Sequence, residues 1–367
     1  MREAARDFDT YSSDLLGDRD VRAYRQLPLE ADPPRHTQFR AAMQPWFMGE
    51  HIAQFAGDFE ELARSIIRDF KARGSGEIAG EFALPFVIGC LGIIYNRPQD
   101  VAEWTAWGAD VWTAEATMAG ISDEAAAAAL SQRDFDQHSL RSGKVLQAYL
   151  DRVFAEAARK HAAGEPATDI WDFVARLEVA GQPIELHEMW GIANVLLAGG
   201  RDTVIKLVTG LIWHLTLNPQ DREFLAANPD WYNRTIGEMV RFLTPLPKME
   251  RAPKSQVGLA DSARNPEEYV LLSFVSANYD KDVWQAPDRI DIHRERTPHL
   301  GFGYGRHSCM GMNITEHEVG ALLRVLLGEW PAWQLDGEPE IEWSTHQGKN
   351  GDEIRIIDRF RSLRVTF

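Results

Sequence analysis

A glycine-rich stretch near the C-terminus carries one of the two cysteines of the chain. It reads Phe302-Gly303-Tyr304-Gly305-Arg306-His307-Ser308-Cys309-Met310-Gly311. Glycine at 303 and 305 permits a tight turn with positive φ and a close approach of the backbone to a flat ligand. The helical spacing of the apolar residues that follow, Val319, Leu322, Leu323, Leu326 and Leu327, predicts a helix after Cys309. We therefore expect Cys309 near a helix N-terminus, where the dipole and free N–H groups favour the metal-binding thiolate.

These residues leave three interpretations of Cys309 open. The first is a buried free cysteine after a glycine turn. The second is a zinc site with His299, His307 and His317, although the usual Cys-x-x-Cys and His-x3–5-His pairs are absent. The third is a haem whose iron is bound by a single thiolate.

The order Phe-Gly-x-Gly-x-His-x-Cys-x-Gly resembles the haem-binding loop of the cytochromes P450, whose iron is held by a cysteine thiolate. The resemblance implies that Cys309 is the proximal ligand and that Phe302 packs on the macrocycle beside the sulfur. It also implies that Gly303, Gly305 and Gly311 let the backbone approach the sulfur and the porphyrin, and that His307 binds a haem propionate.

Composition narrows the class of protein. The 367 residues are 44% hydrophobic and 26% charged, as in ordinary globular proteins. A net charge of -16 argues against nucleic-acid binding and against adhesion to an anionic membrane. No apolar run approaches the ~18 residues of a membrane span, and two cysteines make no disulfide framework. We expect a cytoplasmic protein.

Two cationic side chains stand four residues apart near the N-terminus. His36 and Arg40 follow Asp32-Pro33-Pro34 and share one face if the segment is helical. Alone, this pattern is an exposed helix face. Asp-Pro-Pro-x-His-Thr-x-x-Arg, however, resembles the bacterial P450 helix whose His and Arg bind haem propionates. Residues 51 to about 178 then read as helices, with a strong helix former at Ala125–Ala129.

A long apolar helix is predicted from Glu185 to Leu217, ended by Asn218-Pro219. It is interrupted by Gly199-Gly200-Arg201-Asp202-Thr203. A kink or close helix packing would explain the two glycines, as would a groove for a ligand and water. The run resembles the oxygen-binding part of the central helix in camphor-hydroxylating P450s. That resemblance implies room for O2 at Gly199 and Gly200, with Thr203 and Asp202 delivering protons.

Further family motifs follow in order. Glu238-Met239-Val240-Arg241 matches the Glu-x-x-Arg helix, and Arg289 matches the arginine that completes its buried ion network. Arg251 matches the arginine that reaches a propionate. Strand-like residues run from Tyr269 to Val275, and 354–367 reads as strand and turn. Apolar candidates for the substrate pocket, which could equally be core, are Ile192, Val195, Leu246, Pro247, Ile356 and Ile357.

The resemblance covers most of the chain and implies a mainly helical fold with a minor β portion, one domain over residues 1–367 around a buried haem b. Asp32-Pro33-Pro34 lies closer to the N-terminus than is usual, so the family's first helix and opening strands are expected to be missing. We expect a monooxygenase that hydroxylates or oxidatively dealkylates a small to medium hydrophobic molecule. A peroxide-using or non-catalytic haem-thiolate protein is the alternative, although the acid and alcohol pair Asp202 and Thr203 favours O2 activation.

The electron source is expected outside this chain. The sequence contains no Gly-x-Gly-x-x-Gly opening a βαβ unit and no ferredoxin cysteine set. The resemblance implies a ferredoxin and its reductase as partners, with electrons ultimately from NAD(P)H. Arg306 and Arg35 are candidates for a positive patch that would receive an acidic ferredoxin.

Overall fold

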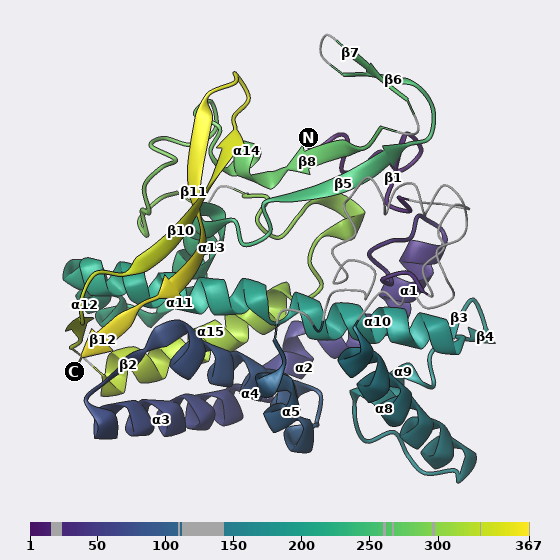
Figure 1. Cartoon of the computed structure of the whole chain (residues 1–367), viewed down its shortest axis with the longest axis horizontal. Helices are drawn as coiled ribbons and strands as arrows, with labels where there is room; N and C mark the ends of the chain where they lie inside the picture. The colour runs from purple at the N-terminus through teal and green to yellow at the C-terminus, as the bar shows by residue number, and fades with distance from the viewer. Residues whose placement is uncertain are drawn as a thin grey trace.

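The computed structural model describes residues 1–15, 24–108, 111, 143–259, 262–265, 268–295, 298–330 and 332–366. A helical layer fills most of the molecule, and the strands form small sheets largely on one side of it (Figure 1). The mainly helical fold with a minor β portion is therefore confirmed. The helix former at Ala125–Ala129 lies outside the described residues.

The described helices alternate with short helical turns. The helices are Arg35–Met43 (α1), Gly49–Ala53 (α2), Ala56–Arg73 (α3), Leu84–Ile94 (α4), Val101–Ala106 (α5), Lys144–Ala162 (α8), Ile170–Val174 (α9), Leu186–Gly199 (α10), Asp202–Leu217 (α11), Pro219–Ala227 (α12), Tyr232–Leu243 (α13), Phe274–Asn278 (α14) and Met312–Glu329 (α15). Single 3-10 turns lie at Gln44–Phe47, Pro98–Asp100, Pro229–Trp231 and Gly305–His307, and a π-helical turn lies at Ala79–Ala83.

The described strands are short and pair antiparallel. They are Tyr11–Ser12 (β1), Ser75–Glu77 (β2), Glu178–Val179 (β3), Gln182–Pro183 (β4), Lys248–Pro253 (β5), Val257–Leu259 (β6), Ser262–Arg264 (β7), Val270–Ser273 (β8), Gln334–Leu335 (β9), Glu340–Gln347 (β10), Glu353–Ser362 (β11) and Arg364–Thr366 (β12). Two sheets have three strands, in the orders β1-β5-β8 and β2-β12-β9. The remaining pairs are the hairpins β3-β4, β6-β7 and β10-β11.

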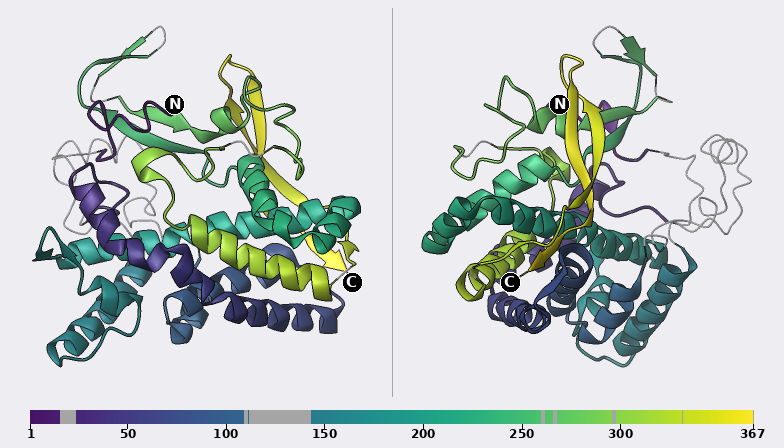
Figure 2. Two further views of the ribbon diagram at one scale, coloured as in Figure 1. Left: turned by 180° about the vertical axis from the view of Figure 1, so that it is seen from behind. Right: turned by 60° about the vertical axis from the view of Figure 1, so that its left-hand side comes forward.

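The apolar stripe after the cysteine loop forms the helix that the sequence predicts. Val319, Leu322, Leu323 and Leu326 are fully buried on α15. This helix packs against α3 and α13, and α13 in turn packs against α11. At ~25 cal/mol per Å2 of apolar surface, such a stripe is the main favourable term that fixes the helix in place. The loop that ends at Cys309 is thus anchored to the centre of the core (Figure 2).

The prediction of one long central helix from Glu185 to Leu217 is wrong. The segment forms two helices, α10 and α11, separated at Gly200 and Arg201, where Arg201 has φ -103° and ψ -82°. Glu185 caps the start of α10 in a box with Glu188, and Asn218-Pro219 ends α11 as expected. Two consecutive glycines weaken the helix enough for the chain to break there.

One expectation about the sheets needs correction. The strand predicted over Tyr269–Val275 is shorter, because β8 ends at Ser273, whose side chain caps the short helix α14. A two-residue strand near the N-terminus, β1, joins the same sheet, with Tyr11 paired to Pro253 and Ser12 to Ala252. The strand and turn predicted over 354–367 are present as β11 and β12, apart from position 367, which lies outside the described residues.

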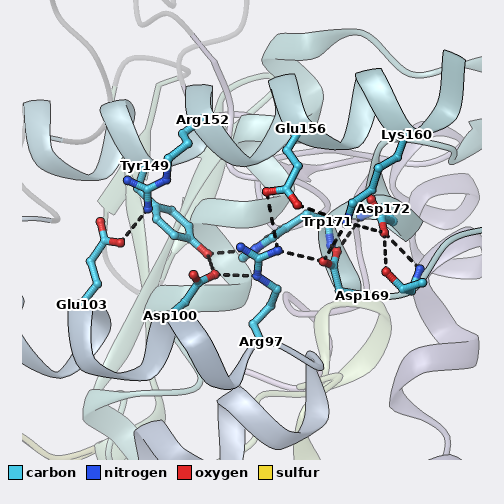
Figure 3. A network of polar contacts seen from close by, with 11 residues as sticks. Arg97, Asp100, Glu103, Tyr149, Arg152, Glu156, Lys160, Asp169, Trp171 and Asp172 are labelled. Atoms are coloured by element: carbon cyan, nitrogen blue, oxygen red, sulfur yellow. Dashed lines mark hydrogen bonds and ion pairs between the residues drawn. The ribbon is translucent and has the colours of Figure 1, made fainter. Parts of the chain in front are cut away.

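A buried polar network joins α5, α8 and α9 around the Arg97 guanidinium (Figure 3). Arg97 Nε donates to Asp100 Oδ2 at 2.6 Å, and Arg97 Nη1 donates to Asp169 Oδ2 at 2.9 Å. The Tyr149 hydroxyl donates to Asp100 at 2.7 Å and accepts from the Trp171 indole at 2.8 Å. Every charge in the centre of this network therefore has a partner of opposite sign.

No helix in the described ranges is both long and apolar enough to cross a membrane.

Candidate functional site

The glycine loop has the backbone conformation that its sequence predicts. Gly303 has φ +70° and Gly305 has φ +74°, both in the left-handed region that side chains rarely adopt. The loop closes by a hydrogen bond from the Cys309 N–H to the Phe302 carbonyl oxygen at 2.8 Å. Phe302 is half-buried against the main core. Cys309 therefore sits three residues before α15 begins, on a turn with little freedom to move.

Opposing electrostatic effects act on the pKa of the Cys309 thiol. Burial raises its pKa above the ordinary value, while the backbone N–H of Gly311, the Arg40 guanidinium and the Met312 N–H lower it. Desolvation is the largest of these effects, and it opposes the lowering that the sequence predicts from the helix N-terminus. The side chain still has accessible surface. Accessible surface amid dense protein indicates that the sulfur borders an internal space.

Two histidines stack beside this loop. The ring centroids of His36 and His307 lie 4.1 Å apart, and His307 Nε2 is 2.9 Å from the Ser13 hydroxyl. Both ring nitrogens of His36 are buried without a hydrogen-bond partner. Burial, assisted by Arg40 and Arg306, lowers the pKa of His36 to about 4. Burial and then His36 lower the pKa of His307 to about 3. Both rings are neutral donors near pH 7.

Two arginines complete this group, which we call the nitrogen cluster: His36, His307, Arg40 and Arg251. The Arg251 side chain is buried and its Nη1 donates to the Glu250 carbonyl oxygen at 2.7 Å. Burial lowers the pKa of Arg251, and Asp32 is the acid among the described residues that raises it. Arg40 instead donates to the loop carbonyl oxygens of Arg306 at 3.0 Å and Ser308 at 2.7 Å. Arg40 thus also fixes the loop.

The break between α10 and α11 is the second candidate element of the site. A Cβ built on Gly199 would meet nothing within 4 Å, so this position opens onto space. A Cβ on Gly200 would lie 3.0 Å from Leu91 Cδ2, so its glycine is explained by close packing. The Thr203 hydroxyl donates to the Gly199 carbonyl oxygen at 3.0 Å. Asp202 is exposed, with Arg201 Nε 3.9 Å from its carboxylate.

Sequence reasoning missed a buried acid behind this break. Glu318 on α15 is fully enclosed, and burial raises the pKa of its carboxyl group to about 8. Its Oε2 has no hydrogen-bond partner, and its neighbours include the Cys90 thiol. Tyr95, which donates to the Leu196 carbonyl oxygen at 3.0 Å, feels the same carboxyl group. A charged residue in the apolar stripe of α15 was the signal in the sequence.

The expected ion network of Glu238 and Arg241 is present, but its third member is different. Arg241 Nε and Nη2 each donate to Glu238 at 2.8 Å, and both side chains are buried. Arg241 also binds the carbonyl oxygens of Asn278 and Pro287. Arg289 offers only its carbonyl oxygen, at 2.9 Å, and its side chain is exposed. Arg294 supplies the second guanidinium, 3.2 Å from Glu238, because the intervening turn carries Arg289 outward.

The six pocket candidates divide into two groups. Ile192, Ile356 and Ile357 are almost completely buried in the main core. Val195 and Pro247 are half-buried, and Leu246 is 42% exposed. Only the second group has surface for a ligand. Because a core residue and a pocket residue are both apolar, the sequence could not separate the two groups.

The arrangement fits a flat anionic cofactor bound through its metal. Unpartnered nitrogens of His36 and the buried Arg251 charge call for acceptors such as carboxylates. The thiol borders an internal space, and Gly199 opens onto space. Iron protoporphyrin, with two propionates and an axial position for sulfur, satisfies these groups. Within the described ranges no group of three side chains could hold a metal, so the zinc interpretation gains no support.

Comparisons with known proteins point the same way. The family model for cytochrome P450 matches residues 231–340, which contain Glu238, Arg241 and the Cys309 loop. Cyclomarin C epoxidase of Salinispora arenicola is 25% identical over 373 residues, covering 100% of this chain and 88% of its own. Linalool 8-monooxygenase of Pseudomonas putida is 24% identical over 299 residues, covering 81% of this chain and 69% of its own.

The fold is shared with solved structures. One, described as a carbohydrate-active P450, superposes with a TM-score of 0.80 at 25% identity and covers 100% of this chain and 89% of its own. This mainly helical fold, together with a glycine loop that carries a single cysteine, is typical of haem-thiolate proteins. The chain belongs to the cytochrome P450 family. It is accordingly an oxidoreductase of the monooxygenase type.

Proposed function

We propose that this protein is a monooxygenase that activates O2 on haem b and inserts one oxygen atom into a small to medium hydrophobic molecule. The observation that carries the proposal is the pairing of the Cys309 thiol, which borders an internal space, with buried cationic and unpartnered nitrogen groups beside it. When bound, haem supplies the redox chemistry of oxygen, and thiolate ligation favours O–O cleavage.

The chain's own residues bind and orient the cofactor in this proposal. Cys309 is the iron ligand, and the N–H groups of Gly311 and Met312 hydrogen-bond its sulfur. His36, His307 and Arg251 hold the two propionates by charge-assisted or neutral hydrogen bonds. Arg40 already binds two loop carbonyl oxygens and donates through Nη2 to the Ser308 hydroxyl oxygen at 3.4 Å, and the second Nη2 hydrogen would bind a propionate. Phe302 packs on the macrocycle.

Protons reach the reaction through the break between α10 and α11. The only proton of the Thr203 hydroxyl is donated to the Gly199 carbonyl oxygen, so its lone pairs face away from that bond. Thr203 can therefore accept a hydrogen bond from water or from a group bound in the space at Gly199. Asp202 is exposed next to it and exchanges protons with solvent. Together they would carry protons from solvent toward the space at Gly199.

Electrons come from separate proteins in this proposal, namely a ferredoxin and its NAD(P)H-dependent reductase. An acidic ferredoxin would dock on the face that carries the Cys309 loop, where the Arg306 side chain is exposed. Arg306 also lies 4.8 Å from the ring of Phe8 by its guanidinium carbon. We take residues 1–367 as one domain built around the haem.

The difference spectrum of the reduced protein with and without carbon monoxide tests the proposal. We expect a strongly red-shifted Soret band for the wild type, because the iron carries a thiolate. Cys309→Ser should lose this band, and Cys90→Ala, which changes the other buried cysteine, should keep it. A wild-type band at the ordinary position, or a shifted band that survives in Cys309→Ser, would contradict the assignment.

A second measurement separates O2 activation from a peroxide-using or non-catalytic role. Thr203→Ala should divert NAD(P)H electrons into hydrogen peroxide, with at least half of the product lost, because the hydroxyl no longer positions a proton. Product per NADH and peroxide per NADH are measured with a substrate that shifts the spin state. Unchanged coupling would mean that Thr203 does not control proton delivery.

A further inference from the structure

A lysine lies on the central helix where a P450 pocket is expected to be apolar. Lys206 is half-buried on α11, three residues after Thr203. Residues three apart on a helix lie on the same face, ~5–6 Å between Cβ atoms. Long side chains on helices lean toward the N-terminus, so the Lys206 stem extends over the turn that holds Thr203. The ammonium group is therefore on the side of the oxygen site.

The same face of α11 meets the hairpin β10-β11. Trp213, seven residues after Lys206 on this face, packs against Phe360 of β11 with ring centroids 5.9 Å apart. Lys206 senses the Asp358 carboxylate of the same strand. Asp358 directly follows Ile357, one of the residues expected at the substrate pocket. Lys206 thus lies on the helix that contacts the hairpin, and Figure 1 shows α11 beside β10 and β11.

The Lys206 charge has no close partner within the described residues. No hydrogen bond and no ion pair within 4.0 Å joins its ammonium group to another side chain there. Burial lowers the pKa of Lys206 to about 8, and Asp358, the one acid that faces it, raises that pKa. Asp358 is itself exposed to solvent, which screens its charge. A half-buried ammonium with this environment gains free energy when an anion binds it.

A histidine on the facing strand feels the same charges. Burial first and then Lys248, the first residue of β5, lower the pKa of His346 on β10, so this ring is neutral near pH 7. Asp358 and Lys206 act on His346 as well. Its Nε2 lies 3.0 Å from the Ser344 hydroxyl. The exposed Asp358 carboxylate therefore remains the one negative charge found to act on Lys206 in the described part of the chain.

We propose that Lys206 binds the carboxylate of the substrate, so that this enzyme oxidises amphiphilic monocarboxylic acids. One buried ammonium neutralises one negative charge, whereas a phosphate dianion would leave a charge unpaired in the same space. The hydrocarbon part then lies along Val195, Leu246 and Pro247, which have free apolar surface. The inference rests on the proposed function, because the acid is oriented toward the Gly199 and Thr203 side of the helix.

Equilibrium binding to the haem-loaded protein tests this inference. The probes are the straight-chain acids from octanoate to tetradecanoate, their methyl esters and the matching primary alcohols. Binding is followed by spin-state shift and by calorimetry, which needs no turnover. We expect at least one acid to bind tenfold or more tightly than its ester and alcohol. Lys206→Met should abolish this preference, and Lys206→Arg should retain most of it.

Lys349→Met is the matched control, because Lys349 is an exposed lysine at the tip of the same hairpin and pairs with Asp282 at 2.8 Å. It removes the same charge without touching α11, so the preference should persist. Equal binding of acid, ester and alcohol, a preference that survives in Lys206→Met, or no saturable acid binding would each overturn the inference. The carbon monoxide spectrum is recorded on every variant, so a failure of the haem-thiolate assignment is seen separately.

Discussion

Two buried groups of charged side chains in this protein differ in whether they are complete. Around Arg97 every charge has a partner of opposite sign, and the hydrogen bonds to Asp100 and Asp169 raise the pKa of Arg97 although burial lowers it (Figure 3). In the nitrogen cluster, burial lowers the pKa of Arg251, and His36 has two unpartnered ring nitrogens.

The difference separates charged groups that stabilise the fold from charged groups that are placed to bind a ligand. A buried network whose donors and acceptors are all paired stabilises the folded protein and has no remaining group to bind a ligand. A buried network with unpaired donors lowers the stability of the haem-free protein, and this loss is offset when a ligand supplies hydrogen-bond acceptors. Stability measurements on the haem-free and haem-loaded protein can therefore separate the two regions.

The largest expected effect is in the complete network. Arg97→Met leaves Asp100 and Asp169 buried without a counter-charge and should lower the free energy of unfolding by ~3–5 kcal/mol. The loss should be similar with and without haem, because the network lies on α5, α8 and α9. Denaturant unfolding of both forms measures it. Arg152→Met removes the exposed pair with Glu103 and a cation–π contact, 5.1 Å from the Tyr149 ring centroid, and should change stability by no more than ~1 kcal/mol.

An intermediate effect is expected from pH in the haem-free protein. His36 has a folded pKa of about 4, below its unfolded value, so the folded state binds fewer protons between these two values. Stability is then fully present above pH ~6.5 and is lost as the pH falls toward 4. The loss attributable to His36 is at most about 3 kcal/mol. Unfolding curves from pH 7 to 4 should be flatter in His36→Phe than in the wild type; equal slopes would argue against a neutral buried ring.

The smallest expected effect is on haem affinity. Arg251→Met removes a buried charge that makes no ion pair within 4.0 Å among the described residues and feels Asp32 only from farther away, so the haem-free protein should keep its stability or gain slightly. Haem should bind ~10–100-fold more weakly, as loss of one charge-assisted hydrogen bond predicts. Transfer of haem to apomyoglobin measures this change. If the haem-free protein were instead destabilised by more than ~1 kcal/mol, Arg251 would belong with Arg97 as a structural residue. Arg355→Met, exposed on β11, is the control.

Local patterns predicted much of this structure. The glycines of the Cys309 loop have the positive φ that their identity indicates, and the stripe on α15 is buried as its spacing requires. Asn218-Pro219 ends α11 where proline must end a helix. In each case the cause lies within a few residues of its effect.

The failures come from interactions between distant residues. Arg294, not Arg289, binds Glu238, because a turn between them decides which side chain points inward. Gly200 packs on Leu91 of another helix, a contact that no local pattern shows. The pKa of Cys309 depends on burial by the whole fold as well as on its helix terminus. The sequence shows Lys206 only as a polar residue in a helix, because the hairpin that packs on this helix is more than 130 residues away in the chain.

The nitrogen cluster joins segments from opposite ends of the described chain. The hydrogen bond from Arg40 to the Ser308 carbonyl oxygen spans 268 residues of sequence, and the hydrogen bond between Ser13 and His307 spans 294. Contacts of such separation form late in folding, because the loop-closure entropy must be overcome before they stabilise the chain. During synthesis His36 emerges long before its partners around Cys309 exist. Haem capture is therefore one of the last steps in the maturation of this protein.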